Sequence, residues 1–169
     1  MVDVVSGAKT MLERRGYTCV KVQPYDESVP CTWLHARDVR CAVLETSLNK
    51  QVATELLQSM AGSGTYIFIV ANLTSQAKEV LTQTEVRVEF LQPSDVAFNK
   101  MEHQYVPRYR VLTEEEVLAL EKKYFATRDK FPVILESDPV CRYMGFRPGQ
   151  VLEITRKTLA AEVSYRTVK

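Results

Sequence analysis

The chain has 169 residues, of which 46% are hydrophobic and 25% charged, and its formal net charge is +1. This composition is typical of one globular domain or two small ones, and it excludes a disordered chain and a strong overall attraction to nucleic acid. The apolar runs are too short to cross a bilayer and residues 1–10 lack the apolar core of a secretory signal, so we expect a soluble intracellular protein with no membrane partner.

The first part of the chain alternates helix and strand patterns, which predicts one small α/β unit over residues 1–98. Helices are expected at 6–15, 49–60 and 73–83, strands at 17–23, 39–45, 65–72 and 85–91, and a loop at 26–30. The most apolar strand, 65–72, is predicted to be central in its sheet. Thr74 or Ser75 is expected to cap the third helix. In the last strand, Glu89 belongs to the side that alternates as polar.

Residues 99–112 predict a connecting segment, because the pattern changes there and Pro107 favours extended backbone before it. Residues 113–169 predict a second, mixed α/β unit, so the whole chain is expected to be α/β (α+β). This unit opens on a capping box, Thr113-x-x-Glu116, followed by a helix whose inward stripe should be Val117, Leu120 and Tyr124.

The stretch 138–150 concentrates turn-forming residues. Asp138 and Pro139 predict the start of a short helix that Gly145 ends. The sequence Arg147-Pro148-Gly149-Gln150 then predicts a type II β-turn. A short extended piece is expected at 131–138, and two strands, 151–157 and 163–168, should follow as a hairpin.

Enzymatic sites receive little support. The cysteines, Cys19, Cys31, Cys41 and Cys141, form no CxxC pair, which favours free thiols in a reducing compartment over a zinc ribbon. The two histidines, His35 and His103, have no nucleophile motif beside them, and the glycines do not form a phosphate loop. We therefore expect no catalytic residue, no metal and no cofactor.

A metal-dependent nuclease or resolvase stays open as an alternative. Its carboxylates would be Asp38, Glu45 and Glu89, and such a site needs a lysine two residues after the second carboxylate. Ser47 stands at that position instead. The interpretation that needs fewest assumptions is that Asp38 and Glu45 are surface carboxylates.

Arginine and tyrosine gather in the last part of the chain, at Arg142, Tyr143, Arg156, Tyr165 and Arg166. These residue types anchor protein interfaces, so the cluster favours a protein partner over nucleic acid.

Residues 104–168 closely resemble the carboxyl-terminal assembly domain of RNA polymerase subunit 5 of eukaryotes, a family that has an archaeal counterpart. The shared pattern comprises Pro107-Arg108, a capped helix from Thr113 to Tyr124, Pro132 and Ile134, then Asp138, Pro139, Val140, Tyr143, Gly145, Gly149, Val151, Ile154 and Arg156, and finally Tyr165-Arg166. Residues 1–98 resemble, more weakly, the amino-terminal jaw domain of the eukaryotic subunit. In the family this jaw is related in fold to nucleases and has no nuclease site.

The resemblance implies a non-catalytic structural subunit of a multisubunit DNA-directed RNA polymerase. The assembly domain would dock on the largest subunit, and the jaw would lie beside downstream double-stranded DNA, with Thr74, Ser75, Gln76 and Lys78 near its backbone. The implied subunit interface comprises Pro107, Arg108, Asp138, Pro139, Arg142, Tyr143, Gly145, Arg147, Gly149, Arg156, Tyr165 and Arg166. Two positions depart from the family pattern, because Ser75 replaces a usual proline and Tyr109 a usual histidine.

The jaw distinguishes the chain from the archaeal form, which lacks one, and it is shorter than in nuclear enzymes. We infer from this resemblance a polymerase encoded by a large DNA virus, located in virions and in the host cytoplasm or nucleus. A divergent protist polymerase, located in the nucleus, is the alternative. A free-standing adaptor that binds polymerase transiently also stays open.

Overall fold

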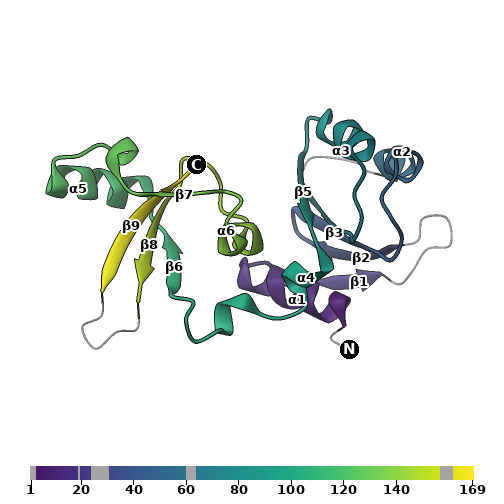
Figure 1. Ribbon diagram of the computed structural model, residues 1–169, viewed down its shortest axis with the longest axis horizontal. Coiled ribbons are helices and arrows are strands. Elements are labelled where there is room, and N and C mark those ends of the chain that lie inside the picture. The colour runs from purple at the N-terminus through teal and green to yellow at the C-terminus, as the bar shows by residue number, and fades with distance from the viewer. Residues whose placement is uncertain (1–2, 19, 24–30, 60–63, 157–161) are drawn as a thin grey trace. The chain divides into compact units, whose positions relative to one another are not determined.

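The computed structural model describes residues 3–18, 20–23, 31–59, 64–156 and 162–169. The chain divides into two compact units, Met1–Asn99 and Lys100–Lys169 (Figure 1). The loop expected at 26–30 lies outside the described residues. None of the described helices is long and apolar enough to cross a membrane.

The first unit is built on a five-stranded sheet in the order β1-β2-β3-β4-β5, antiparallel up to β3 and parallel from β3 to β5. Its elements are α1 Val4–Arg14, β1 Lys21–Gln23, β2 Cys31–Ala36, β3 Val39–Leu44, α2 Lys50–Ser59, β4 Thr65–Ile69, α3 Ser75–Thr82, β5 Arg87–Leu91 and α4 Pro93–Val96. The predicted strand 65–72 is thus an interior strand, next to the edge strand β5. β2, for which the sequence predicted no element, forms a hairpin with β3.

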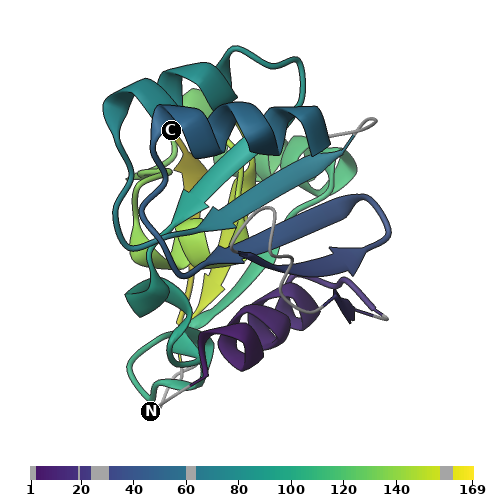
Figure 2. The same cartoon turned by 90° about the vertical axis from the view of Figure 1, so that its right-hand side faces the viewer.

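Helices cover both faces of this sheet (Figure 2). α2 and α3 pack over one face, where Leu56 and Leu81 join Tyr66 and Phe68 in a buried apolar cluster. α1 contacts β2 and β3 and buries Met11. Full burial of such side chains is the main stabilising contribution, about 2 kcal/mol for each large one.

The second unit holds a four-stranded sheet in the order β6-β8-β9-β7, in which only the pair β7–β9 is parallel. Its elements are η1 Lys100–Glu102, β6 Arg108–Val111, α5 Glu114–Tyr124, η2 Arg128–Lys130, β7 Val133–Ile134, α6 Pro139–Met144, β8 Val151–Thr155 and β9 Val163–Val168. The predicted connecting segment 99–112 therefore contributes a strand, β6, to this sheet.

Each face of the second sheet has its own helix and its own apolar cluster. Cys141 and Phe146, from α6 and the turn after it, pack against Leu152 and Ile154 of β8. α5 places Val117 and Leu120 in the cluster on the other face. The inward stripe predicted for α5 ends one turn early, because Tyr124 is 52% exposed.

The capping and turn predictions in this unit are confirmed. Thr113 and Glu116 form the capping box of α5, and the Asp138 carboxylate accepts a hydrogen bond from the Val140 N–H at 2.8 Å. Gly145 ends α6 at φ 68° and Gly149 has φ 88°, as a type II turn requires at its third position. The Gln150 N–H donates to the Arg147 carbonyl at 3.1 Å, which closes that turn.

Candidate docking and nucleic-acid surfaces

The four residues predicted near DNA lie at the start of α3 and are all exposed. Thr74 is the N-cap, since its hydroxyl accepts from the Ala77 N–H at 3.3 Å and donates to the Leu48 carbonyl at 3.2 Å. Its side chain therefore fixes the helix start. Ser75 and Gln76 occupy the first helical positions, where backbone N–H groups have no acceptor within the helix.

The start of α2 lies beside the start of α3. Leu48 and Leu73 form a parallel bridge, and the Leu48 N–H donates to the Asn72 carbonyl at 2.9 Å. Asn49 caps α2 by accepting from the Val52 N–H at 3.0 Å. Two helix N-termini, each with partial positive charge, therefore lie at the same edge of the sheet, a feature that the sequence analysis missed.

The three carboxylates of the nuclease alternative cannot share one metal ion. Asp38 precedes β3 and Glu45 follows it, so the rise of an extended strand separates them by roughly 20 Å. Glu89 lies within β5, where its carboxylate is 2.7 Å from Arg15 Nη1 and 2.9 Å from Arg87 Nε. Among the described residues, no group of three or more His, Cys, Asp or Glu side chains could hold a metal.

Glu89 lies on the side of β5 that alternates as polar, yet its side chain is largely buried. Its side chain is 16% exposed, and the Arg15 side chain that pairs with it is 5% exposed. Arg15 is the C-cap of α1, so a side chain from the end of this helix reaches Glu89 on the polar side of β5. The ion pair ties the end of α1 to an edge strand and contributes to the fold of the first unit.

Several residues predicted at the subunit interface have local structural roles. Asp138 and Pro139 start α6, Gly145 ends it and Gly149 forms the turn before β8. Tyr143 is 1% exposed in the isolated chain, so its side chain has little surface to offer a partner. The buried Tyr143 ring stabilises the fold, so truncating it would lower the free energy of unfolding and would test folding rather than docking.

The exposed and half-buried members of the predicted interface do not form one surface. Arg156 follows Ile154 by two residues, which places both on the α6 side of β8, and Arg166 pairs with Leu152 on that same side. Tyr165 pairs with Glu153 on the α5 side. Arg108 lies on the α5 side as well. Side chains two residues apart in a strand point to the same side, and Arg110 of the same strand hydrogen-bonds Glu116 on α5. Pro107 precedes β6 and is half-buried, and Arg147 is exposed in the turn after α6.

On the α6 side, two arginines border Tyr109, whose ring lies 6.2 Å from that of Phe146. Burial raises the pKa of the Tyr109 phenol, and Asp138 and Cys141 act in the same direction against Arg166 and Arg156. Arg166 Nη1 donates to the Val133 carbonyl at 3.2 Å. Arg156 is 54% exposed and its Nη1 lies 3.9 Å from Glu162, a distance that leaves it available to a partner carboxylate.

On the α5 side, Arg110 joins three elements. Its guanidinium bonds both carboxylate oxygens of Glu153 on β8 at 3.2 Å and one oxygen of Glu116 on α5 at 2.7 Å. Glu116 also accepts from the Thr113 N–H at 2.9 Å, so one carboxylate serves the helix cap and the sheet. These hydrogen bonds raise the pKa of Arg110 and lower that of Glu116.

The second unit coincides with a known sequence family. The family described as "RNA polymerase Rpb5, C-terminal domain" matches residues 98–168. The Pyrococcus abyssi protein "DNA-directed RNA polymerase subunit Rpo5" is 44% identical over 68 residues, which are 40% of this chain and 83% of that protein.

Two eukaryotic relatives match a longer part of the chain. The Arabidopsis thaliana protein "DNA-directed RNA polymerases IV and V subunit 5B" is 27% identical over 128 residues, 75% of this chain and 59% of that protein. The Dictyostelium discoideum protein "DNA-directed RNA polymerases I, II, and III subunit rpabc1" is 29% identical over 127 residues, 72% of this chain and 64% of that protein. Both alignments thus cover less than two thirds of the relative.

These relatives are all subunits of DNA-directed RNA polymerases, and the second sheet with its two helices falls inside the matched region. The chain belongs to the RNA polymerase subunit 5 family, which includes eukaryotic and archaeal members.

Proposed function

We propose that the chain is a non-catalytic structural subunit of a multisubunit DNA-directed RNA polymerase. The observation that carries this proposal is the 44% identity with an archaeal subunit over 68 residues, together with the family match over residues 98–168. The distance between Asp38 and Glu45 supports the non-catalytic role, because hydrolysis by two metal-bound carboxylates needs them at one site.

The second unit would dock on the largest polymerase subunit through the α6 side of its sheet. Arg156 and Arg166 supply guanidinium groups there that suit carboxylates on the partner. We expect Arg156→Ala to weaken assembly by about 1–3 kcal/mol, the range of interface hot spots. Lys9→Ala, an exposed position on α1 in the first unit, is the matched control and should leave assembly unchanged.

The test of the subunit role is purification of the tagged chain from its native cells or particles at high salt. The two large polymerase subunits should come with it in equal amounts. A transient adaptor would wash off, and a chain that elutes by itself would refute the proposal. Parallel purifications from virions and from nuclei test the proposed viral origin against a cellular polymerase.

The first unit would lie beside downstream DNA, with the starts of α2 and α3 toward the phosphates. Ser75 and Gln76 offer backbone N–H groups, and Lys78 adds a charge one turn later, which suits phosphate contact without base reading. In the assembled polymerase, Lys78→Ala should lower the salt dependence of downstream DNA binding by about one counterion, equally for all sequences. Lys9→Ala is again the control, and an equal slope for both variants would contradict the contact.

A further inference from the structure

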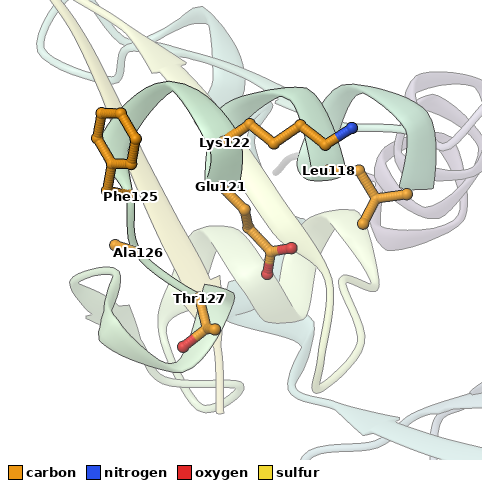
Figure 3. A pocket seen from close by; sticks show the side chains of 6 residues that line it. All are labelled: Leu118, Glu121, Lys122, Phe125, Ala126 and Thr127. Carbon is orange, nitrogen blue, oxygen red and sulfur yellow. The ribbon is translucent and has the colours of Figure 1, made fainter.

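A groove on the outer side of α5 is used by none of the contacts proposed above. It has a volume of about 440 Å³ and is lined by Leu118, Glu121, Lys122, Phe125, Ala126 and Thr127 (Figure 3). These positions follow the three- and four-residue spacing of one helix face and continue past the helix end. Because Val117 and Leu120 face the core, the groove lies on the side of α5 that the fold leaves uncovered.

Phe125 is unusual in both its backbone conformation and its exposure. It caps α5 in the left-handed conformation, φ 50°, and among the described residues no other non-glycine has positive φ. Glycine is the usual residue there, because a side chain is strained in this region. Phe125 is also 97% exposed, so its ring contributes almost nothing to the core. Glycine would end the helix without backbone strain, so a strained position with an exposed aromatic ring indicates a function for the ring.

The rest of the lining gives the groove its apolar floor and a positive rim. Leu118 is 50% exposed and lies two turns before Phe125. Glu121 is already engaged, since its carboxylate accepts from the Arg128 N–H at 2.7 Å and lies 3.6 Å from Arg128 Nε. Lys122 is exposed, and no ion pair of it is found within the described residues. The charge that the groove offers to a partner is therefore positive.

We propose that this groove binds a segment of another polymerase subunit in which an apolar side chain lies near a carboxylate. The apolar side chain would fill the space between Leu118 and Phe125, and the carboxylate would pair with Lys122. This inference rests on the proposed function and adds to it a second docking surface. That surface is separate from the α6 side of the sheet, because α5 and α6 cover opposite faces.

Photo-crosslinking in the assembled polymerase identifies the occupant. A benzoylphenylalanine in place of Phe125 should crosslink to a polymerase subunit, at a segment with an apolar residue and an Asp or Glu within about one helical turn. The same probe in place of Tyr105, which is 82% exposed and outside the groove lining, is the control. A crosslink to nucleic acid, to a segment without a carboxylate, or to no subunit at all would overturn the proposal.

Dissociation measurements separate binding from folding. Phe125→Gly removes the ring and suits the left-handed backbone, so the variant should fold normally but leave the polymerase about tenfold faster. Lys122→Glu should behave likewise, whereas Lys122→Arg and Tyr105→Gly should keep the wild-type half-life. Wild-type half-lives for Phe125→Gly and Lys122→Glu would refute the groove and leave the subunit role intact. A wild-type chain that never copurifies with polymerase would refute both.

Discussion

Removing Glu89 tests whether its carboxylate holds the first unit together. The pair with Arg15 has an N–O distance of 2.7 Å, and the Arg15 side chain is 5% exposed, so water cannot replace the lost carboxylate. Breaking a buried pair from one side costs about 3–5 kcal/mol. Because Glu89 keeps 16% exposure, we expect the lower end, about 3 kcal/mol, for Glu89→Ala.

The assay is urea unfolding followed by the fluorescence of Trp33, the single tryptophan of the chain. Trp33 lies in β2, so its signal reports the first unit. Glu45→Ala is the matched control, because this carboxylate is exposed and its loss should change the free energy of unfolding by less than about 0.5 kcal/mol. Equal small effects for both variants would refute the structural role of the Glu89 pair.

The same experiment separates the ion pair from a metal ligand. If Glu89 belonged to a nuclease site, Mg²⁺ would stabilise the wild-type first unit by mass action and would lose that effect in Glu89→Ala. The Arg15 pair predicts unfolding curves that do not depend on Mg²⁺ in either protein. A magnesium-dependent shift in the wild type, absent from the variant, would restore the nuclease alternative.

Three other outcomes are expected. Burial raises the pKa of the Cys41 thiol to about 12. As pH rises, the unfolded chain therefore loses the thiol proton before the folded chain does, and the free energy of unfolding falls. Between about pH 8 and pH 10 this free energy should fall by about 1.4 kcal/mol. Unfolding followed by Trp33 fluorescence should show this fall in the wild type and not in Cys41→Ala. Thr113→Ala should destabilise α5 by about 1 kcal/mol, seen as faster hydrogen exchange along that helix. Gly149→Ala, at φ 88°, should cost about 1 kcal/mol and speed exchange at the start of β8, although no atom blocks the added methyl group.

Local signals decided which elements the sequence could predict. The capping box at Thr113, the glycine at Gly145 and the turn at Gly149 each require particular residues, so the elements of the second unit could be predicted closely. β2 lacked such a signal, because the two-residue turn Arg37-Asp38 that joins it to β3 contains no glycine or asparagine. The short strand β6 was interpreted as part of a connecting segment because it also lacks a local sequence signal of this kind.

The faces of the sheets were harder to predict than the strands. Alternation assigned Glu89 to a polar face, but only the fold shows that Arg15, at the end of α1, pairs with this carboxylate and leaves it largely buried. Likewise, Tyr165 and Arg166 are adjacent in sequence and therefore point to opposite sides of β9. A cluster of interface-type residues in the sequence thus became two separate surfaces.

The residues that carry the family resemblance divide into those that shape the fold and those whose side chains are available to a partner. Asp138, Gly145 and Gly149 shape α6 and the turn after it, and the Gly149 N–H donates to the Val168 carbonyl at 2.9 Å, which fixes this turn to the end of β9. These residues define the fold by their local geometry, Asp138 through its capping carboxylate and the two glycines through their backbone conformation. The Arg156 side chain, which belongs to the same family pattern, and the Phe125 ring, which does not, are exposed. Sequence identity to the family therefore reports the scaffold and part of the proposed docking surface, and partner choice should be sought in substitutions at exposed positions such as Phe125.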